Sequence, residues 1–160
     1  MNKFRLFRVS ALLVLVLGLV ACDDDDITGT GQSLARVEFD APDAAKTGTT
    51  FSIDIRALNV GLSNVRNGRV EVTLGAPLGI LSLDASPGTT ATFSNGAFGG
   101  RITWDLGTLD SNSQSRLTVQ TIGVLAPSEG SRTAALEASL TGEGIAAGEA
   151  VARDSVTINP

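Results

Sequence analysis

From Leu34 onward, apolar and polar residues alternate in short stretches, the pattern typical of half-buried β-strands. Phe51, Ile53 and Ile55, for example, alternate with polar neighbours. Glycine, proline and asparagine turn signals separate the stretches, and no window after residue 33 carries a helical stripe. The pattern predicts an all-β fold, an antiparallel β-sandwich of about seven to nine strands. The expected strands fall near residues 34–39, 51–56, 70–74, 80–83, 91–93, 102–106, 117–124, 136–140 and 156–158.

The alternation also selects a core and several irregular positions. Ile122 and Val124 break the phase of their stretch, which predicts a β-bulge or a twist near Thr121. Turn signals at 59–61 and 67–68 bracket a turn-rich connection. Trp104 lies in the middle of a predicted strand, so we expect a core residue there and no ligand platform. The predicted core is Phe51, Ile53, Ile55, Val70, Val72, Leu83, Ile102, Trp104, Leu106, Leu117, Val119, Leu136 and Leu140.

The segment before this domain has a different pattern. Residues 1–8 contain Lys3, Arg5 and Arg8 and no acid, and residues 9–21 are almost wholly apolar. An apolar run this short cannot span a bilayer core, which needs roughly 20 helical residues. A basic start, a short apolar middle and a small residue at its end predict a signal peptide over residues 1–21. An uncleaved membrane anchor is the alternative.

This segment ends in Leu19-Val20-Ala21-Cys22, which resembles the lipobox of bacterial lipoproteins. The resemblance implies cleavage between Ala21 and Cys22, acylation of Cys22 (palmitate is a typical group) and anchoring in the lipid bilayer of the cell envelope. Several acyl chains give a stable anchor where a single chain gives a marginal one. An ordinary signal peptide followed by a chance cysteine is the alternative. Serine in place of Cys22 should leave the domain folded and the precursor uncleaved.

Residues 22–33, which include four consecutive aspartates at 23–26, predict a flexible acidic tether ahead of the domain at 34–160. The aspartates could instead contribute to a calcium site, although a calcium cage needs six to eight oxygens arranged in space. They could also act as a sorting signal. An aspartate directly after the cysteine resembles an inner-membrane retention signal of enteric lipoproteins. An acidic run at the same place resembles a surface-export signal of some other Gram-negative groups. Both the periplasmic face and the cell surface therefore stay open as locations.

Composition narrows the function further. The formal net charge is −5, and removal of residues 1–21 would make it more negative, which argues against a nucleic-acid partner. The chain has no histidine, and Cys22 is its one cysteine, so we expect no Ser-His-Asp or Cys-His catalysis, no zinc site and no cofactor. Two carboxylates could in principle catalyse glycoside hydrolysis. Most of the candidate carboxylates, however, fall on the polar phase of their strands, which is typical of solvated side chains. These candidates are Asp54, Glu71, Asp105 and Asp110.

An ordered set of motifs between Lys46 and Ile158 resembles an Ig-like repeat domain of bacterial surface proteins, catalogued as domain of unknown function eleven. That resemblance implies an Ig-like sandwich in an envelope or surface protein, without a shared enzymatic activity or catalytic residues. The turn before Leu117 lacks the family's usual glycine. The matching motifs are Gly48 to Ile55, Asn59-Val60-Gly61, Val70 to Leu74, Pro77-Leu78-Gly79, Ala85 to Gly88, Trp104 to Leu109, Ser113-Gln114-Ser115 and Leu117-Thr118-Val119.

A second resemblance is to cohesin-like modules, which also open on a Gly-x-x-Phe strand, here Gly48 to Phe51. It implies a module that binds a protein or glycan partner, and the segment from Trp104 fits it less well. The glycine-rich loops Gly75–Gly79 and Asn95–Gly100 would then let backbone approach a ligand. A single tryptophan and the lack of tyrosine argue against a stacking platform for glycans.

Overall fold

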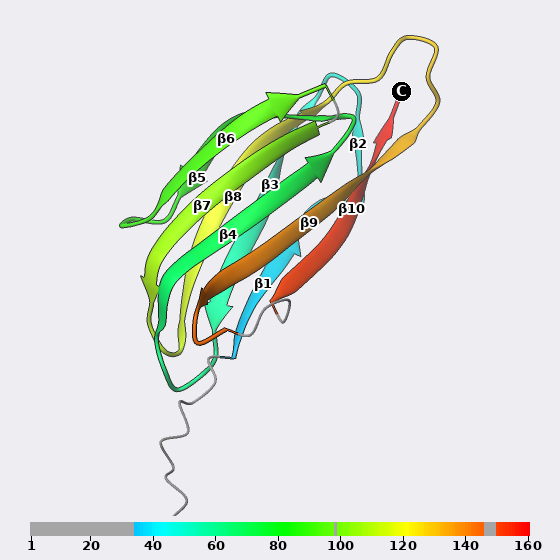
Figure 1. Cartoon of the computed structure of the whole chain (residues 1–160). Helices are drawn as coiled ribbons and strands as arrows, with labels where there is room; N and C mark the ends of the chain where they lie inside the picture. The colour runs from blue at the N-terminus through cyan, green and yellow to red at the C-terminus, as the bar shows by residue number, and fades with distance from the viewer. Residues whose placement is uncertain (1–33, 98, 146–149) are drawn as a thin grey trace, which may run out of the picture.

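The computed structural model describes residues 34–97, 99–145 and 150–160. Two β-sheets pack face to face in this part of the chain, and strands far apart in sequence lie side by side in each layer (Figure 1). The strands are β1 (Ala35–Asp40), β2 (Ala44–Lys46), β3 (Thr50–Asn59), β4 (Val65–Gly75), β5 (Leu78–Ala85), β6 (Thr90–Gly96), β7 (Gly99–Leu109), β8 (Ser113–Gly123), β9 (Arg132–Glu143) and β10 (Val151–Asn159).

The two sheets differ in size. The smaller has the order β1-β3-β8-β5, and the larger has the order β2-β10-β9-β4-β7-β6. Neighbouring strands are antiparallel except β2, which pairs parallel to β10. The predicted all-β sandwich is confirmed. The described residues form ten strands where the sequence predicts seven to nine, because three-residue β2 is too short to show an alternation.

The core lies between the sheets and follows the inward phase of each strand. Trp104 is completely buried, and its indole nitrogen donates to the Thr89 hydroxyl over 3.0 Å, so its predicted role as a core residue is confirmed. The other predicted core residues are buried too, except Phe51 and Leu83, which are half-buried and pack against the core. The predicted core left out the small residues Ala57 and Ala138, which are fully buried, because alanine carries a weak apolar signal.

Two irregular positions differ from their predictions. The bulge expected near Thr121 is absent from β8: Thr121 keeps the inward phase, is fully buried, and donates to the Phe51 carbonyl over 3.0 Å. Because a hydroxyl can satisfy its hydrogen bond on the neighbouring strand, a polar residue occupies a core position here. An irregular register does lie opposite Thr121, but it lies in the neighbouring strand β5, between Ile80, which pairs with Thr121, and Ser82. Asn67-Gly68, predicted as a turn, lies inside β4 at a shift in register.

The long strands give the sandwich two ends, which lie opposite each other in Figure 1. The Leu34 end comprises Leu34, the β3–β4 loop at 60–64 and the β7–β8 turn at 110–112. The glycine end comprises the β4–β5 turn, the β6–β7 turn and the β8–β9 loop. The predicted signal peptide, the cleavage site at Ala21 and Cys22, and the tether lie outside the described residues. Where the structure is described, no helix has the length and apolar character needed to cross a membrane.

Candidate functional site

At the glycine end, the β6–β7 turn presses its backbone directly onto the β4–β5 turn. Gly99 has a φ of 115°, and a Cβ atom placed on it would lie 2.0 Å from the carbonyl oxygen of Leu74. A Cβ on Gly100 would lie 2.5 Å from Cδ1 of Ile80. At Gly99, where the neighbour is backbone, only glycine permits so close an approach. The two loops that the sequence marks as candidates, Gly75–Gly79 and Asn95–Gly100, are therefore neighbours in the fold.

A side-chain amide fastens the two sheets together beside this turn. The Asn95 amide nitrogen donates to the Ile80 carbonyl over 2.8 Å, and the Ile80 amide donates to Oδ1 of Asn95 over the same distance. Asn95 belongs to the larger sheet and Ile80 to the smaller one. The amide reproduces the pair of hydrogen bonds that a strand would make, so the two sheets are held in a fixed relation next to the loops.

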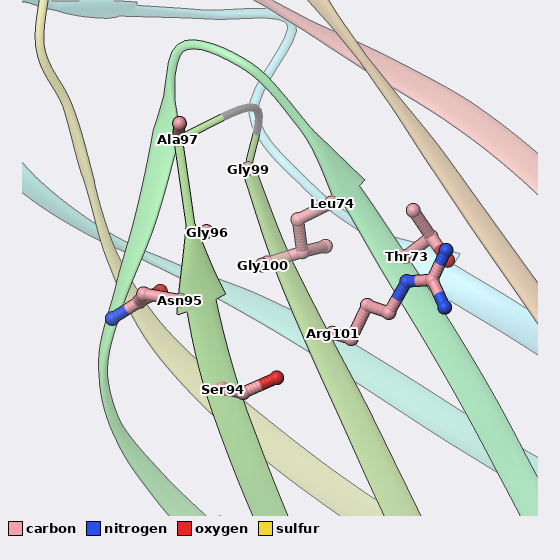
Figure 2. A pocket seen from close by; sticks show the side chains of 9 residues that line it. All are labelled: Thr73, Leu74, Ser94, Asn95, Gly96, Ala97, Gly99, Gly100 and Arg101. Carbon is pink, nitrogen blue, oxygen red and sulfur yellow. The ribbon is translucent and has the colours of Figure 1, made fainter.

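A cleft of about 280 Å³ opens on the outer side of this turn. Figure 2 shows the side chains of Thr73 and Arg101 close together on adjacent strands, with Ser94 on the next strand along, as the strand registers require. Gly96 and Ala97 form the rim. A second hollow of about 300 Å³ lies on the other side of the turn. Residues that line it include Pro77, Gly79, Ala97, Val124 and Arg132.

The cleft offers binding groups and no reactive ones. Arg101 forms no ion pair with any residue that the structure describes, whereas Arg132 lies 3.2 Å from the Glu129 carboxylate. An unpaired guanidinium next to hydroxyls can hold an acidic or polar segment of a ligand. None of the described residues that line the cleft could act as a nucleophile paired with a base. The sequence located the loops but missed Thr73 and Arg101, because alternation marks both only as solvated positions.

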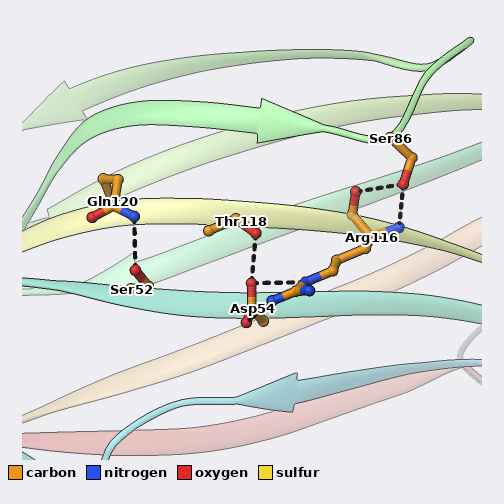
Figure 3. Close-up of polar contacts among 6 residues, drawn as sticks. All are labelled: Ser52, Asp54, Ser86, Arg116, Thr118 and Gln120. Atoms are coloured by element: carbon orange, nitrogen blue, oxygen red, sulfur yellow. Dashed lines mark hydrogen bonds and ion pairs between the residues drawn. The ribbon is translucent and has the colours of Figure 1, made fainter.

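The outer face of the smaller sheet carries a polar network that spans two strands and the β5–β6 loop (Figure 3). Arg116 on β8 donates from Nε to Oδ1 of Asp54 on β3 over 3.1 Å, and a second guanidinium nitrogen pairs with the other carboxylate oxygen. Thr118 donates to the same carboxylate over 2.6 Å. Ser86 and the backbone of Arg116 bond to each other in both directions, at 2.8 and 3.0 Å. These bonds fasten the β5–β6 loop to β8.

The network keeps Asp54 ionised. Hydrogen bonding from Arg116 is the largest effect and lowers the pKa of Asp54 below its usual value, although partial burial opposes it. The Asp54 side chain is 20% exposed and that of Arg116 is 61% exposed. A carboxylate that already accepts three hydrogen bonds is a poor general acid. We therefore interpret this network as a structural connection between strands.

The four carboxylates considered for glycoside hydrolysis do not form one site. Asp54 lies on the outer face of the smaller sheet, and Asp110 lies in the β7–β8 turn at the Leu34 end. Glu71 and Asp105 lie on the outer face of the larger sheet, on either side of Arg69, whose Nε is 3.8 and 3.7 Å from their respective carboxylates. Both are more than half exposed and sit on an open strand surface, where no cleft could enclose a sugar.

The Leu34 end is held by side chains. Asn59 is fully buried, and its amide nitrogen lies 2.8–3.1 Å from the carbonyl oxygens of Ser63, Leu109 and Asp110. Its Oδ1 accepts from the Gly61 amide over 3.1 Å. One asparagine thus joins the β3–β4 loop to the β7–β8 turn. The motif Asn59-Val60-Gly61, singled out in the sequence as a turn, has this structural role.

Two predicted sites cannot be placed on the fold. Cys22 and Ala21, the predicted lipidation and cleavage residues, lie outside the described residues, as do the four aspartates of the tether. Among the residues that are described, no group of three or more histidine, cysteine, aspartate or glutamate side chains could hold a metal ion. The calcium alternative for the aspartates stays a prediction.

Comparisons with known proteins identify the fold. No protein-family model matches the chain, and no curated protein sequence matches it. The structure is similar to the CARDB domain of the PF1109 protein from Pyrococcus furiosus, solved in complex with di-metal ions: 15% identity, TM-score 0.54, 80% of this chain and 94% of that one. It is also similar to a cohesin module from the family 33 glycoside hydrolase of Clostridium perfringens: 11% identity, TM-score 0.56, 79% of this chain and 98% of that one.

A third similar structure is AvmM, which catalyses macrocyclization in alchivemycin A biosynthesis: 12% identity, TM-score 0.50, 79% of this chain and 89% of that one. At identities this low, the likenesses show the fold alone. They confirm the Ig-like sandwich and include the cohesin-like modules that the sequence resembles. Membership of the domain-of-unknown-function-eleven family stays a prediction.

Proposed function

We propose that this chain is a bacterial lipoprotein of the cell envelope, anchored through acylated Cys22 and carrying a non-enzymatic Ig-like module. We also propose that this module is related to the domain-of-unknown-function-eleven repeat of surface proteins, which it resembles in sequence motifs. Its support in the sequence is the lipobox Leu19 to Cys22 directly after a basic and then apolar segment. The cleft at the glycine end, which offers hydrogen-bonding groups without a reactive pair, supports a contact role over a catalytic one.

One observation carries the proposal: the first described strand, β1, begins at Ala35, at the end of the sandwich opposite the glycine end (Figure 1). An anchor at Cys22 would hold the Leu34 end nearest the bilayer, since only residues 23–33 separate them. The cleft beside Arg101 would then face away from the membrane, where a partner can reach it. The periplasmic face and the cell surface are both open to such a module.

The anchor is tested by labelling growing cells with a fatty-acid analogue. Cys22→Ser should abolish the label and leave an uncleaved precursor, because the thiol that accepts the lipid is gone. Thr28→Ser, beyond the motif, is the matched control and should label like the natural chain. Normal labelling of Cys22→Ser would contradict the lipobox assignment, whatever the fate of the domain.

A second candidate function, a cohesin-like module that binds a protein or glycan partner, is favoured by the meeting of the two glycine loops around one cleft. Ala97→Trp, on the cleft rim, should weaken capture of envelope components by about ten-fold or more, a loss typical of a blocked contact centre. Leu62→Trp is the matched control at the other end, where Leu62 is 90% exposed. Equal capture by both variants would remove the cleft as the binding site.

A further inference from the structure

A sandwich has four edge strands, and each one presents backbone N–H and C=O groups that another strand could pair with. In this protein the edges are β1 and β5 of the smaller sheet, and β2 and β6 of the larger sheet. Natural proteins block such edges with charges, bulges or short strands. A comparison of the four edges shows which of them is left open.

Three edges carry a blocking feature. Strand β1 presents Arg36, Glu38 and Asp40 in alternation, and Arg36 pairs with Glu38 at 3.0 Å. Strand β2 has only three residues. Strand β5 has an irregular register between Ile80 and Ser82, and it carries Asp84. Each of these features hinders the approach of a regular strand.

Strand β6 carries none of them. Its sequence, TATFSNG, contains no charge and no proline, and every residue except Ala91 is exposed. It pairs with β7 alone within the described part of the chain, and it forms the outer margin of the larger sheet (Figure 1). An uncharged, regular strand of seven residues is a template for strand addition.

The same edge exposes apolar side chains. Phe93 is 41% exposed, and Leu81 on the neighbouring strand β5 is 49% exposed. The hydrogen bonds between Asn95 and Ile80 fix the two strands side by side. Two large apolar groups thus lie next to an unpaired backbone edge, and a partner that pairs with the backbone would also cover them.

We propose that a second copy of this chain pairs with β6, antiparallel and about a two-fold axis at Phe93, the middle residue of the strand. In this register Phe93 faces Phe93 of the second copy, and Thr92 faces Ser94. The pairing brings together two aromatic rings and two pairs of hydroxyls, contacts that stabilise antiparallel strands. No like charges oppose each other, because β6 has none. The larger sheets of the two copies become one continuous sheet.

The geometry stops the assembly at a dimer. A two-fold contact consumes the same edge on both copies, so an assembly can grow further only through a different edge. The remaining edges, β1, β2 and β5, carry the blocking features described above. The proposal does not depend on acylation of Cys22.

Cysteines introduced into the full-length chain test this register. The chain carries Cys22→Ser, so that the introduced thiol is the only one, and is purified in mild detergent and oxidised with glutathione disulfide. Phe93→Cys should give a covalent dimer on a non-reducing gel, because directly opposed strand residues have Cα atoms about 4.5–5.5 Å apart, within disulfide range. The yield should exceed that of the controls about ten-fold.

Two control variants separate pairing from random collision. In the proposed register, position 92 of one copy faces position 94 of the other, so the two positions 92 are offset by two residues. The thiols of Thr92→Cys would be too far apart for a disulfide. Val151→Cys, on β10, has a similar exposure to Phe93. The double variant Thr92→Cys with Ser94→Cys keeps Phe93 and should cross-link if Phe93→Cys fails to fold. The proposal would be overturned if Thr92→Cys or Val151→Cys gave as much covalent dimer as Phe93→Cys. It would also be overturned if neither Phe93→Cys nor the double variant gave a dimer.

Discussion

At the Leu34 end, one buried asparagine side chain reaches the carbonyls of three residues and ties a loop to a turn. At the glycine end, the Asn95 amide joins the two sheets beside the turns, but the turns themselves meet backbone to backbone where Gly99 lies against the Leu74 carbonyl. The first arrangement fills the space between its loops with a side chain. The second has no side chain between its turns at the closest approach, at Gly99, and a cleft lined by Arg101 and Thr73 lies beside it. The difference teaches that turn-forming residues with similar sequence signals can close one end of a sandwich and open the other.

Asn59→Ala should have the largest effect, because it leaves the carbonyls at the Leu34 end without their donor. We expect the free energy of unfolding to fall by about 3 kcal/mol, measured by denaturant titration. Asn64→Ala, which removes the exposed hydrogen bonds of Asn64 to Asp110 and Ser111, should cost about 0.5 kcal/mol. Similar losses in the two variants would show that burial of Asn59 does not hold this end.

Gly99→Ala should follow, because alanine brings both an unfavourable positive φ and a Cβ that overlaps the Leu74 carbonyl. We expect a loss of about 2 kcal/mol and a displaced β6–β7 turn. Gly96→Ala, in the same hairpin, is the matched control, since its Cβ would meet only the Gly99 carbonyl oxygen at an ordinary 3.6 Å. Thermal melting of both variants measures the difference, and equal melting temperatures would refute the close approach.

Asp54→Asn should have the smallest effect, at a site between the two ends. The pKa of Asp54 is lowered in the folded chain, so its contribution is complete above the ordinary aspartate value and disappears as pH falls through the lowered one. We expect a loss of about 1 kcal/mol near neutral pH that shrinks in acid, measured by denaturant titration across pH. Gln120→Ala, which removes the separate, uncharged hydrogen bond from Gln120 to Ser52 on the same two strands, should cost the same at every pH. A constant difference for Asp54→Asn would contradict the ionic account.

Much of this fold could be predicted from alternation, because each long strand buries one face against the other sheet. Alternation failed where a buried polar side chain finds a hydrogen-bond partner in the fold. Thr121 donates to the Phe51 carbonyl on the neighbouring strand, and the Asn59 amide donates to loop carbonyls. It also failed at β2, which is too short for a period. The candidate site was half predictable, since glycines mark the two loops. Their meeting, and the position of Arg101 beside them, depends on strand order, which no local pattern encodes.

The claim that most needs a test is that the Leu34 end faces a bilayer because Cys22 is acylated. The direct measurement is the intact mass of the mature protein extracted from membranes of its source organism, followed by sequencing of its amino terminus. The account predicts a chain that begins at Cys22 and is heavier than the unmodified polypeptide by the mass of its acyl and diacylglycerol groups. A mature chain that begins elsewhere, or that begins at Cys22 with an unmodified mass, would contradict it.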